Sequence, residues 1–415
     1  MTRKSVLREL EDTVRIDHIE TIHLYFEYPE GKGWVGPWGR VKGRLASLIR
    51  VHTDDGRVGT GSAYSHPELV EVTVKHLRPF LIGLDPLQIE RMWWRLFFRT
   101  NWYGRKGVAL TTMGGLDQAF WDLLGQQEGK PVWELLGGED SRVPAYASGL
   151  LYSSPETVAD TAVRMVEKGF RRVKFRTGVD EQYDRKTVSL TRAAVGPKID
   201  LMADGTRRYN LEMATSLARH LVEHRIFWFE EPFQPLEIDD LVALRQVAGL
   251  PIAVGECEFG VEGFRELIRC GAADILQADA SRCGGISELN RIAEMTKSAG
   301  LQFAPHSWCD PVAVIANGHV VAAHRHGLTV EVDQTGNRFI EGLLGEPLTV
   351  EDGLLDLGRR PGLGIELDPD FVEAHRLPDV TQIPDGNHGD MIFGFHATDP
   401  IPPYTTLDGR RLDFD

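Results

Sequence analysis

Long apolar runs, paired cysteines and an excess of positive charge are all missing from this sequence. No stretch of about 18 apolar residues occurs and the chain does not open on an apolar segment, so neither a membrane span nor a secretory signal is predicted. The four cysteines form no Cys-x-x-Cys pair, which favours free thiols over a disulfide framework. With a formal charge of −15 at pH 7, nucleic acid and anionic membranes are poor partners. We expect a cytoplasmic protein that acts on a small molecule.

The composition is that of a globular protein, at a length that suits more than one domain. Hydrophobic residues make up 42% of the 415 positions and charged residues 26%, as in ordinary globular domains. A chain of this length exceeds what one small core holds, so two domains are expected. Because the net charge is negative, an anionic substrate would need a local cluster of cationic side chains.

A series of short apolar segments, each ending in an ionisable side chain, organises the middle of the chain. They lie at 173–176, 200–204, 226–230, 251–256, 274–279, 301–306 and 328–331, and a further apolar segment at 143–147 precedes them. Helical patterns occur near 155–168, 181–194, 210–224, 238–247, 261–270, 285–298 and 311–325. Brief apolar strands alternating with helices are typical of a parallel sheet. Ionisable groups at successive strand ends are typical of a barrel mouth, so we predict an α/β fold with a (β/α)8-type barrel, a modified TIM barrel.

The segments on either side of the barrel predict an α+β unit. An alternating strand at 16–28, a hairpin of 46–52 with 57–62, and helices near 67–81, 86–99 and 108–127 precede the barrel. Short strands at 348–350 and 362–367 are expected to return to this unit. The predicted boundaries are 1–140 for the N-terminal α+β domain, 141–340 for the barrel, and 341–415 for a C-terminal segment that completes the N-terminal domain and ends in an extended tail.

Three carboxylates close neighbouring strands at equal intervals. Asp204, Glu230 and Glu256 are each 26 residues apart, about one strand-helix repeat, so their side chains should meet. Three oxygen ligands without His or Cys suit Mg²⁺. Without a metal they would repel one another, and one would have to be protonated.

A histidine and an aspartate form the predicted acid–base pair. His306 closes the seventh strand and Asp279 the sixth, next to it. A carboxylate paired with an imidazole fixes its tautomer and raises its pKa, which makes a usable general base. Glu331 ends the eighth strand and is a candidate hydrogen-bond partner for a substrate carboxylate.

Two cations share one face of the second strand. Lys174 and Arg176 alternate, so both are expected to point into the barrel mouth. They would be costly there unless they faced carboxylates or an anionic ligand, and they supply the local positive charge that the chain as a whole lacks.

Together these residues resemble the enolase superfamily, mandelate racemase subgroup, over nearly the whole chain. The matching motifs are Lys174-Phe175-Arg176, Asp204, Glu230-Glu231-Pro232, Gly255-Glu256, Asp279, Ser281-Arg282-Cys283-Gly284-Gly285, His306, Glu331, Trp121-Asp122-Leu123-Leu124-Gly125 and Leu135-Leu136-Gly137-Gly138. The resemblance implies an N-terminal capping domain over the barrel. It also implies a first step in which Mg²⁺ coordinates the substrate carboxylate, a base removes the α-proton and the metal holds the enediolate.

By this resemblance Asp204, Glu230 and Glu256 are the metal ligands, His306 with Asp279 is the base, and Lys174 and Glu331 support the carboxylate as it gains charge. Many members have a second lysine as an opposite base where this chain has Arg176. A guanidinium, with a pKa above about 12, is a poor proton acceptor at neutral pH. The expected activity is therefore a hydro-lyase that dehydrates an aldonate or aldarate to a 2-keto-3-deoxy acid.

Other functions remain open from the sequence. An epimerase, racemase or cycloisomerase could use the same site, and a barrel that binds a sugar acid or partner without catalysis is a further alternative. Substrate selection is expected in the 31–40 loop, the 102–106 stretch and Arg207 or Arg208. We expect a homo-oligomer with a small sugar acid as its substrate.

Overall fold

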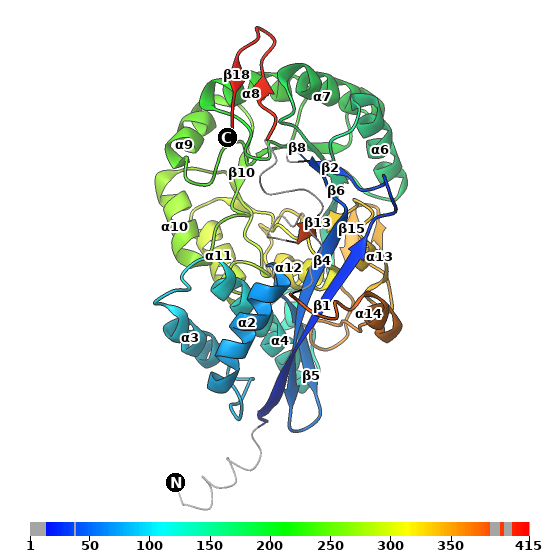
Figure 1. Ribbon diagram of the computed structural model, residues 1–415. Helices are drawn as coiled ribbons and strands as arrows, with labels where there is room; N and C mark the ends of the chain where they lie inside the picture. Colours follow the sequence, from blue (N-terminus) through cyan, green and yellow to red (C-terminus); the bar gives the residue numbers. More distant parts are fainter. Residues whose placement is uncertain (1–13, 37–38, 382–390, 394–400, 415) are drawn as a thin grey trace, which may run out of the picture.

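A parallel barrel ringed by helices forms the larger part of the computed structural model (Figure 1), which describes residues 14–36, 39–381, 391–393 and 401–414. Its strands are β6 (Arg142–Leu150), β7 (Arg172–Arg176), β8 (Asp200–Asp204), β9 (Phe229–Glu230), β10 (Ile252–Val254), β11 (Ile275–Leu276), β12 (Gln302–Phe303) and β13 (Val330–Asp333). Consecutive strands from β6 to β12 pair in parallel, and β13 pairs with β6. A parallel bridge between Phe303 and Gly327 joins the last two strands. The predicted α/β barrel is confirmed.

Each of the first seven strands is followed by a helix that covers the outside of the barrel. These are α6 (Pro155–Glu167), α7 (Glu181–Val195), α8 (Leu211–Glu223), α9 (Ile238–Val247), α10 (Gly260–Cys270), α11 (Ile286–Ser298) and α12 (Pro311–Ala323). Several start at a side chain that accepts a hydrogen bond from the first turn, as Asp180 does from Tyr183 N (2.7 Å) and Asn210 from Met213 N (3.0 Å). Local capping signals of this kind explain why the helical patterns in the sequence mark real boundaries.

Large side chains fill the interior of the barrel. Tyr146, Met202, Trp228 and Ile275 belong to one buried cluster with two alanines, so the barrel is a packed core and not a pore. Trp228 also donates its indole N–H to Glu230 Oε2 at 2.9 Å. A residue of the apolar core thereby holds the Glu230 carboxylate in place at the end of its strand.

The N-terminal unit is an antiparallel sheet packed against helices. Its strands are β1 (Ile16–Glu27), β4 (Gly43–Thr53) and β5 (Val58–Ser62), joined by β16 (Ile392–Phe393) from the far end of the chain, and β2 (Val35–Gly36) and β3 (Gly39–Arg40) form a small separate hairpin. Its helices are α2 (Pro67–Leu77), the 3-10 turn η1 (Arg78–Phe80), α3 (Ile89–Thr100), α4 (Val108–Glu128) and α5 (Val132–Leu135). The predicted α+β arrangement is therefore found, with the predicted hairpin of β4 and β5.

After β13 the chain passes over both units. The short helix α13 (Arg338–Gly342) is followed by β14 (Val350–Glu351) and β15 (Leu354–Asp356), and β15 pairs antiparallel with the start of β6. The expectation that 348–350 returns to the N-terminal unit is therefore wrong, because the open edge of β6 takes this hairpin. The 362–367 segment does return, since Leu363 N donates to Asp122 Oδ1 on α4 at 2.9 Å.

Residues 401–414 of the C-terminal tail rest on this chain's own barrel, while β16 pairs with β4 of the N-terminal sheet. Helix α14 (Pro369–His375) comes before the tail, and β17 (Tyr404–Thr405) pairs with β18 (Arg411–Leu412) beside α7 and α8 at the top of Figure 1. Arg410 forms an ion pair with Glu212 of α8 at 2.6 Å. Residues 382–390, 394–400 and 415, which belong to the predicted tail, lie outside the described residues.

Buried polar contacts hold the N-terminal unit against the barrel. Asp117 on α4 accepts hydrogen bonds from the backbone N–H and the hydroxyl of Ser287, at 2.9 and 2.6 Å. Gly285 has φ +105°, and a Cβ there would lie 2.3 Å from Asp117 Oδ2. A side chain at this glycine would therefore force α4 away from the barrel.

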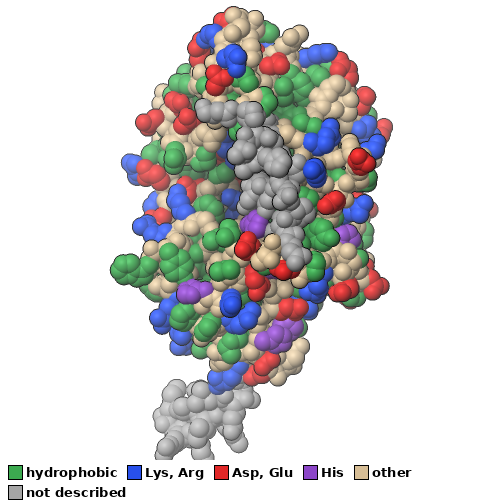
Figure 2. All heavy atoms as spheres, viewed as in Figure 1, with side chains coloured by type: hydrophobic (Ala, Val, Ile, Leu, Met, Phe, Trp, Pro, Cys, Tyr) green, Lys and Arg blue, Asp and Glu red, His purple; other side chains and the backbone are tan. Residues whose placement is uncertain are grey.

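The surface carries both signs of charge. In Figure 2 acidic and basic side chains are interspersed over the face shown. Among the described residues no helix is both long enough and apolar enough to cross a membrane. All four cysteines are free, as predicted.

A buried histidine joins α12 to the segments around it. His319 accepts a hydrogen bond from Trp133 N at Nδ1 (2.9 Å), and its Nε2 donates to the Leu363 carbonyl (3.2 Å). These two bonds fix a neutral tautomer, and burial lowers the pKa of His319 to about 4. The unfolded chain therefore binds this proton more tightly, so stability falls as the pH drops from 6.5 towards 4. A change from 6.5 to about 4 corresponds to about 3 kcal/mol.

We predict that His319→Phe destabilises the protein at pH 7.5 by about 2–4 kcal/mol, because two buried backbone groups lose their partners. The difference from the wild type should narrow as the pH falls from 6.5 to 4.5, since only the wild type loses stability through this imidazole. Urea unfolding of both proteins across this range measures the difference. A gap that stays constant down to pH 4.5 would contradict the assigned tautomer.

Candidate active site

Strand register brings the predicted side chains to one level at the carboxyl ends of the barrel. Arg176 pairs with Asp204 between β7 and β8, and Asp204 pairs with Glu230 between β8 and β9. One carboxylate oxygen from each of Asp204, Glu230 and Glu256 lies within 4.8 Å of the other two. The three predicted carboxylates therefore do converge on one point.

Two cations are embedded among these carboxylates. The ammonium of Lys174 forms ion pairs with Glu230, with Glu331 at 3.0 Å and with Asp204 at 3.5 Å, while Arg176 pairs with Asp204. Burial alone would lower the pKa of Lys174, but the carboxylates of Glu230 and Glu331 outweigh burial and raise it well above its ordinary value. Burial likewise opposes the charge on Arg176, and Asp204 leads the carboxylates that raise the pKa of that guanidinium. Neither side chain releases a proton at neutral pH.

Negative charge still exceeds positive charge at the centre of the cluster. The pKa of Glu230 is raised to about 8, first by burial and then by the neighbouring carboxylates of Asp204, Glu331 and Glu256, against the opposing pull of Lys174. A group in that position is relieved by a further cation. Oxygen-only donors at this spacing fit a hard divalent ion such as Mg²⁺.

An imidazole faces the same point from the opposite side. His306 Nδ1–H donates to Asp279 Oδ2 at 2.8 Å, which leaves Nε2 as the proton acceptor, 3.8 Å from Glu256 and 4.0 Å from Glu331. Burial lowers the pKa of His306, but Glu331, the Asp279 hydrogen bond and Glu256 together raise it to about 9. Without a bound cation the imidazole is therefore mostly protonated at neutral pH, and its Nε2 faces the carboxylates.

The two acidic partners of His306 are themselves fixed. Asp279 accepts hydrogen bonds from the Ser281 backbone N–H and hydroxyl (2.8 and 2.7 Å) and from the Asn317 amide (3.0 Å). Glu331 accepts one from Ser307 N at 3.0 Å. Burial would raise the pKa of Glu331, but Lys174 and His306 hold it well below its usual range.

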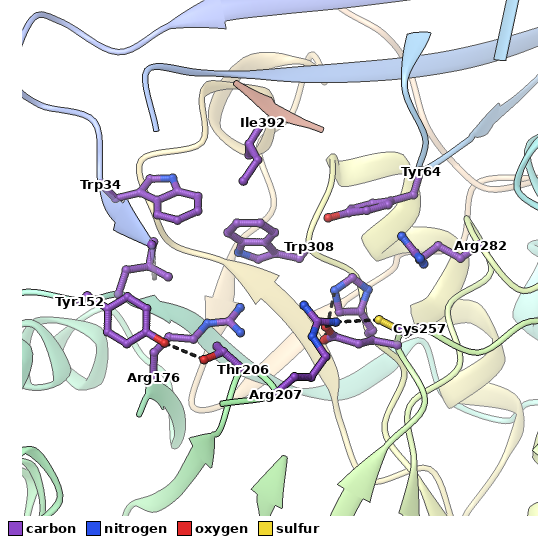
Figure 3. A pocket seen from close by; sticks show the side chains of 14 residues that line it. Trp34, Tyr64, Tyr152, Arg176, Thr206, Arg207, Cys257, Arg282, Trp308 and Ile392 are labelled. Atoms are coloured by element: carbon purple, nitrogen blue, oxygen red, sulfur yellow. Dashed lines mark hydrogen bonds and ion pairs between the residues drawn. The ribbon is translucent and has the colours of Figure 1, made fainter. Parts of the chain in front are cut away.

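A cavity of about 730 Å³ opens above this cluster (Figure 3). It is lined by Trp34, Gly36, Tyr64, Leu151, Tyr152, Arg176, Thr206, Arg207, Glu256, Cys257, Arg282, His306, Trp308 and Ile392. Three of the eight predicted site residues, Arg176, Glu256 and His306, line the cavity itself. The other five lie beneath its lining, each at most 1% exposed: Lys174, Asp204, Glu230, Asp279 and Glu331.

The segments predicted to select the substrate are only partly at this cavity. Trp34 and Gly36 of the 31–40 loop and Arg207 line it. Arg208 turns away, because its guanidinium donates to Gly178 O at 3.0 Å and stacks on Phe414 at 3.9 Å. The 102–106 stretch contributes Arg105 and Lys106 to a different cavity, between α3 and α10.

Known proteins share this architecture. The family model described as "Mandelate racemase / muconate lactonizing enzyme, N-terminal domain" matches residues 39–137, and the one described as "Enolase C-terminal domain-like" matches residues 157–371. The chain belongs to this enolase superfamily group. The two matches follow the N-terminal unit and the barrel as the structure shows them.

Individual relatives cover most of the chain. A D-galactarolactone cycloisomerase from Agrobacterium fabrum is 33% identical, over 81% of this chain and 92% of its own length. An arabinonate dehydratase from Saccharolobus solfataricus is 32% identical, over 79% and 89%. The crystal structure of L-talarate dehydratase from Polaromonas sp. JS666 with Mg and L-glucarate is similar with a TM-score of 0.77 and 27% identity, covering 88% of this chain and 98% of that one.

Several residues of the cavity in this enolase superfamily member were not predicted from its sequence. Tyr64 follows β5 by two positions, Tyr152 follows β6 by two, and Trp308 follows His306 by two. An aromatic residue just beyond a strand end is the signal that could have found them. Arg207 was one of two predicted candidates, and what sets it apart from Arg208 is the backbone shape of its turn, since Thr206 and Arg207 both have left-handed φ, +48° and +62°. That turn directs Arg207 to Glu256 (3.1 Å) and to Cys257 Sγ (2.6 Å).

An ion pair between the two units positions the Trp308 ring. Arg44 on β4 pairs with Asp333 at the end of β13 at 2.8 Å, and both side chains are at most 1% exposed. Arg44 also donates to the Trp308 carbonyl at 2.9 Å, and its guanidinium lies 4.1 Å from the centre of the Trp308 ring. One wall of the cavity thus depends on a charge contributed by the N-terminal sheet.

We predict that Arg44→Met costs about 3–5 kcal/mol, because it leaves the Asp333 carboxylate buried without its cation. The double variant Arg44→Met/Asp333→Asn should cost less than the sum of the two single changes. Arg50→Met on the same strand, whose 3.7 Å pair with Glu20 is one-third exposed, is the matched control and should stay within about 1 kcal/mol of the wild type. Urea unfolding of the four variants gives the coupling energy, and simple additivity would refute the pairing.

Proposed function

We propose that this chain is a Mg²⁺-dependent hydro-lyase that dehydrates an aldonate or aldarate to its 2-keto-3-deoxy acid. The observation that carries the proposal is an asymmetry across the site. A basic imidazole, His306, faces the carboxylate cluster from one side. The second strand offers only Arg176, whose charge Asp204 holds in place. A divalent cation bound among these carboxylates would offset the field that raises the pKa of His306, so that Nε2 could accept a proton, whereas Arg176 stays a permanent cation.

Asp204, Glu230 and Glu256 would hold the Mg²⁺. When bound, the ion supplies a Lewis acid that draws electrons from the substrate carboxylate and makes the neighbouring C–H more acidic. The L-talarate dehydratase structure with Mg and L-glucarate supports this assignment. Lys174, beneath the cluster, would keep a positive charge close to the carboxylate as that group gains electron density.

His306 would remove the α-proton through Nε2, while Asp279 keeps the ring in the tautomer that can accept it. The electron pair of the broken C–H bond moves towards the carboxylate and then forms the double bond between C2 and C3. The C3 hydroxyl leaves with the proton that His306 returns, so one water is released for each substrate molecule. The enol left behind tautomerises to the 2-keto acid.

The cavity lining suits a hydroxylated anion. Arg176, Arg207 and Arg282 bring three guanidinium groups to it, and such groups bind carboxylates and hydroxyls in fixed geometry. Arg176 would bind the carboxylate or a hydroxyl of the substrate. These guanidinium groups bring positive charge to the cavity, although the net charge of the whole chain is −15.

A cycloisomerase is the second candidate, and the 33% identity to a D-galactarolactone cycloisomerase favours it. Such a reaction can also begin with proton removal by one base. Racemisation is less favoured, because it needs a competent base on each face of the substrate. The product mass separates the two candidates, since an isomer keeps the water that a dehydratase loses.

Incubation of the protein and Mg²⁺ with a panel of aldonates, aldarates and their lactones should yield a 2-keto acid from at least one member, detected with semicarbazide and by mass. His306→Asn should abolish both turnover and exchange of the α-hydrogen in D₂O. The surface variant His18→Asn, with a half-exposed imidazole, is the control and should keep full activity. A product of unchanged mass would establish the cycloisomerase instead. Absence of any product across the panel, or exchange retained in His306→Asn, would overturn the proposal.

Metal binding can be tested apart from turnover. Mg²⁺ should raise the melting temperature of the wild type and should not raise that of Glu256→Gln. The affinity lost should exceed the roughly 10–100-fold that removal of an outer-sphere partner costs. Glu258→Gln, which loses only an ion pair with Lys106, should bind Mg²⁺ as the wild type does. Isothermal titration gives both affinities, and equal binding by the two variants would exclude Glu256 as a ligand.

A further inference from the structure

A second cluster of metal-binding side chains lies on the outside of the barrel. His220 and Glu223 are at the end of α8, and His224 is the residue that caps it. One ligand atom from each of the three lies within 4.8 Å of the other two. Helix α8 belongs to the outer ring in Figure 1, so this cluster is separate from the carboxylates at the strand ends.

The spacing along α8 explains why the three side chains meet. Positions three and four apart lie on one face of a helix, and His220-Leu221-Val222-Glu223-His224 uses both intervals. Two histidines four apart on a helix are a known way to bind one zinc ion. The two rings are 4.2 Å apart, centre to centre.

A backbone carbonyl lies within hydrogen-bond distance of one ring nitrogen of each imidazole. His224 Nδ1 lies 2.9 Å from the carbonyl of His220 and donates to it, which leaves the lone pair on Nε2. His220 Nε2 lies 3.1 Å from the carbonyl of Arg185, which leaves the lone pair on Nδ1, 3.7 Å from Glu223 Oε2. Metal-binding histidines typically donate their other ring N–H to a carbonyl in this way. The hydroxyl of Ser189 lies 3.1 Å from His224 Nε2 and 3.3 Å from His220 Nε2, and it donates to the Arg185 carbonyl at 2.9 Å, so a bound ion would replace its contact with His224.

The cluster is open to solvent on its carboxylate side. The His220 side chain is 12% exposed and that of Glu223 is 72% exposed, so the imidazoles are held in place while the carboxylate faces water. The C-terminal end of a helix carries partial negative charge. The guanidinium of Arg185 is occupied by Glu181 and Ser216, and that of Arg192 by backbone carbonyls.

We propose that His220, Glu223 and His224 form a site for a transition-metal dication of the zinc class, distinct from the Mg²⁺ site. Two imidazole nitrogens and one carboxylate oxygen form a donor set that zinc prefers, with water completing the tetrahedron. Mg²⁺ favours oxygen ligands and should not compete. All three ligands come from one helix end, so the ion would fix the last turn of α8 and its contact with α7.

The test is zinc titration of the full chain under saturating Mg²⁺. The wild type should bind one equivalent of Zn²⁺ with a Kd below about 10 μM. His220→Gln and His224→Gln should each lose this binding, and Glu223→Gln should weaken it about tenfold. His326→Gln is the matched control, since His326 is not part of the His220, Glu223 and His224 cluster, and it should bind as the wild type does.

Two further measurements distinguish this site from the catalytic centre. Glu256→Gln should retain the zinc equivalent, and Co²⁺ should give the absorption of a nitrogen-ligated tetrahedral ion that His224→Gln lacks. Zinc binding that survives both histidine changes would overturn the proposal. A Kd above about 100 μM in the wild type would overturn it as well.

Discussion

The structure depends on how negative charge is balanced at the mouth of the barrel. Four buried or nearly buried carboxylates gather there, and at such distances like charges repel strongly in a medium that screens poorly. Lys174 reduces this repulsion, because its ammonium contacts Asp204, Glu230 and Glu331, which lie on three different strands. The residual excess of negative charge would give the site its affinity for a divalent cation. Lys174 thus neutralises part of the negative charge and joins the strands, and the negative charge that remains would bind the metal.

The two units contribute different parts of the candidate site. The eight predicted site residues all stand on barrel strands or within three residues after them. Trp34, Tyr64 and Ile392 reach the cavity from the N-terminal sheet and its extensions. The buried pair of Arg44 and Asp333 joins these two layers and sets the Trp308 ring between them. The candidate catalytic side chains therefore come from the barrel, while the shape of the cavity above them depends on how the two units pack together.

The sequence predicted the strand ends well because each is specified locally. Equal spacing of Asp204, Glu230 and Glu256 on apolar strands leaves little freedom in where their side chains go. How deep each of these side chains lies within the barrel mouth was not predictable in the same way. Lys174 and Arg176 were both expected to point into the barrel mouth, and they lie at different depths there because two residues along a strand are about 7 Å apart. Lys174 is consequently enclosed by carboxylates, and Arg176 lines the cavity.

Loop residues escaped prediction for a related reason, since their direction is set by tertiary contacts. Arg207 and Arg208 are neighbours in the same turn, yet one points to Glu256 and the other to Phe414. No periodic pattern distinguishes them, because the left-handed φ of Thr206 and Arg207 is maintained by surrounding contacts such as the bond from Arg207 N to the Glu231 carbonyl. The segment 348–350 was misplaced in the same manner, because an unpaired edge of β6 attracts a strand that the sequence cannot assign to either unit.

His306 and Arg176 differ in how the surrounding carboxylates affect their ability to exchange a proton. Both reach the cavity, and both are influenced by the same carboxylates. An imidazole in that field becomes more basic and still exchanges its proton, whereas a guanidinium becomes only more firmly charged. In the proposed mechanism, the same electrostatic environment would make one side of the cavity reactive and the other side a fixed anchor. A substrate held between them would lose a proton to one face only, which would suit elimination or one-base isomerisation and disfavour inversion by two bases.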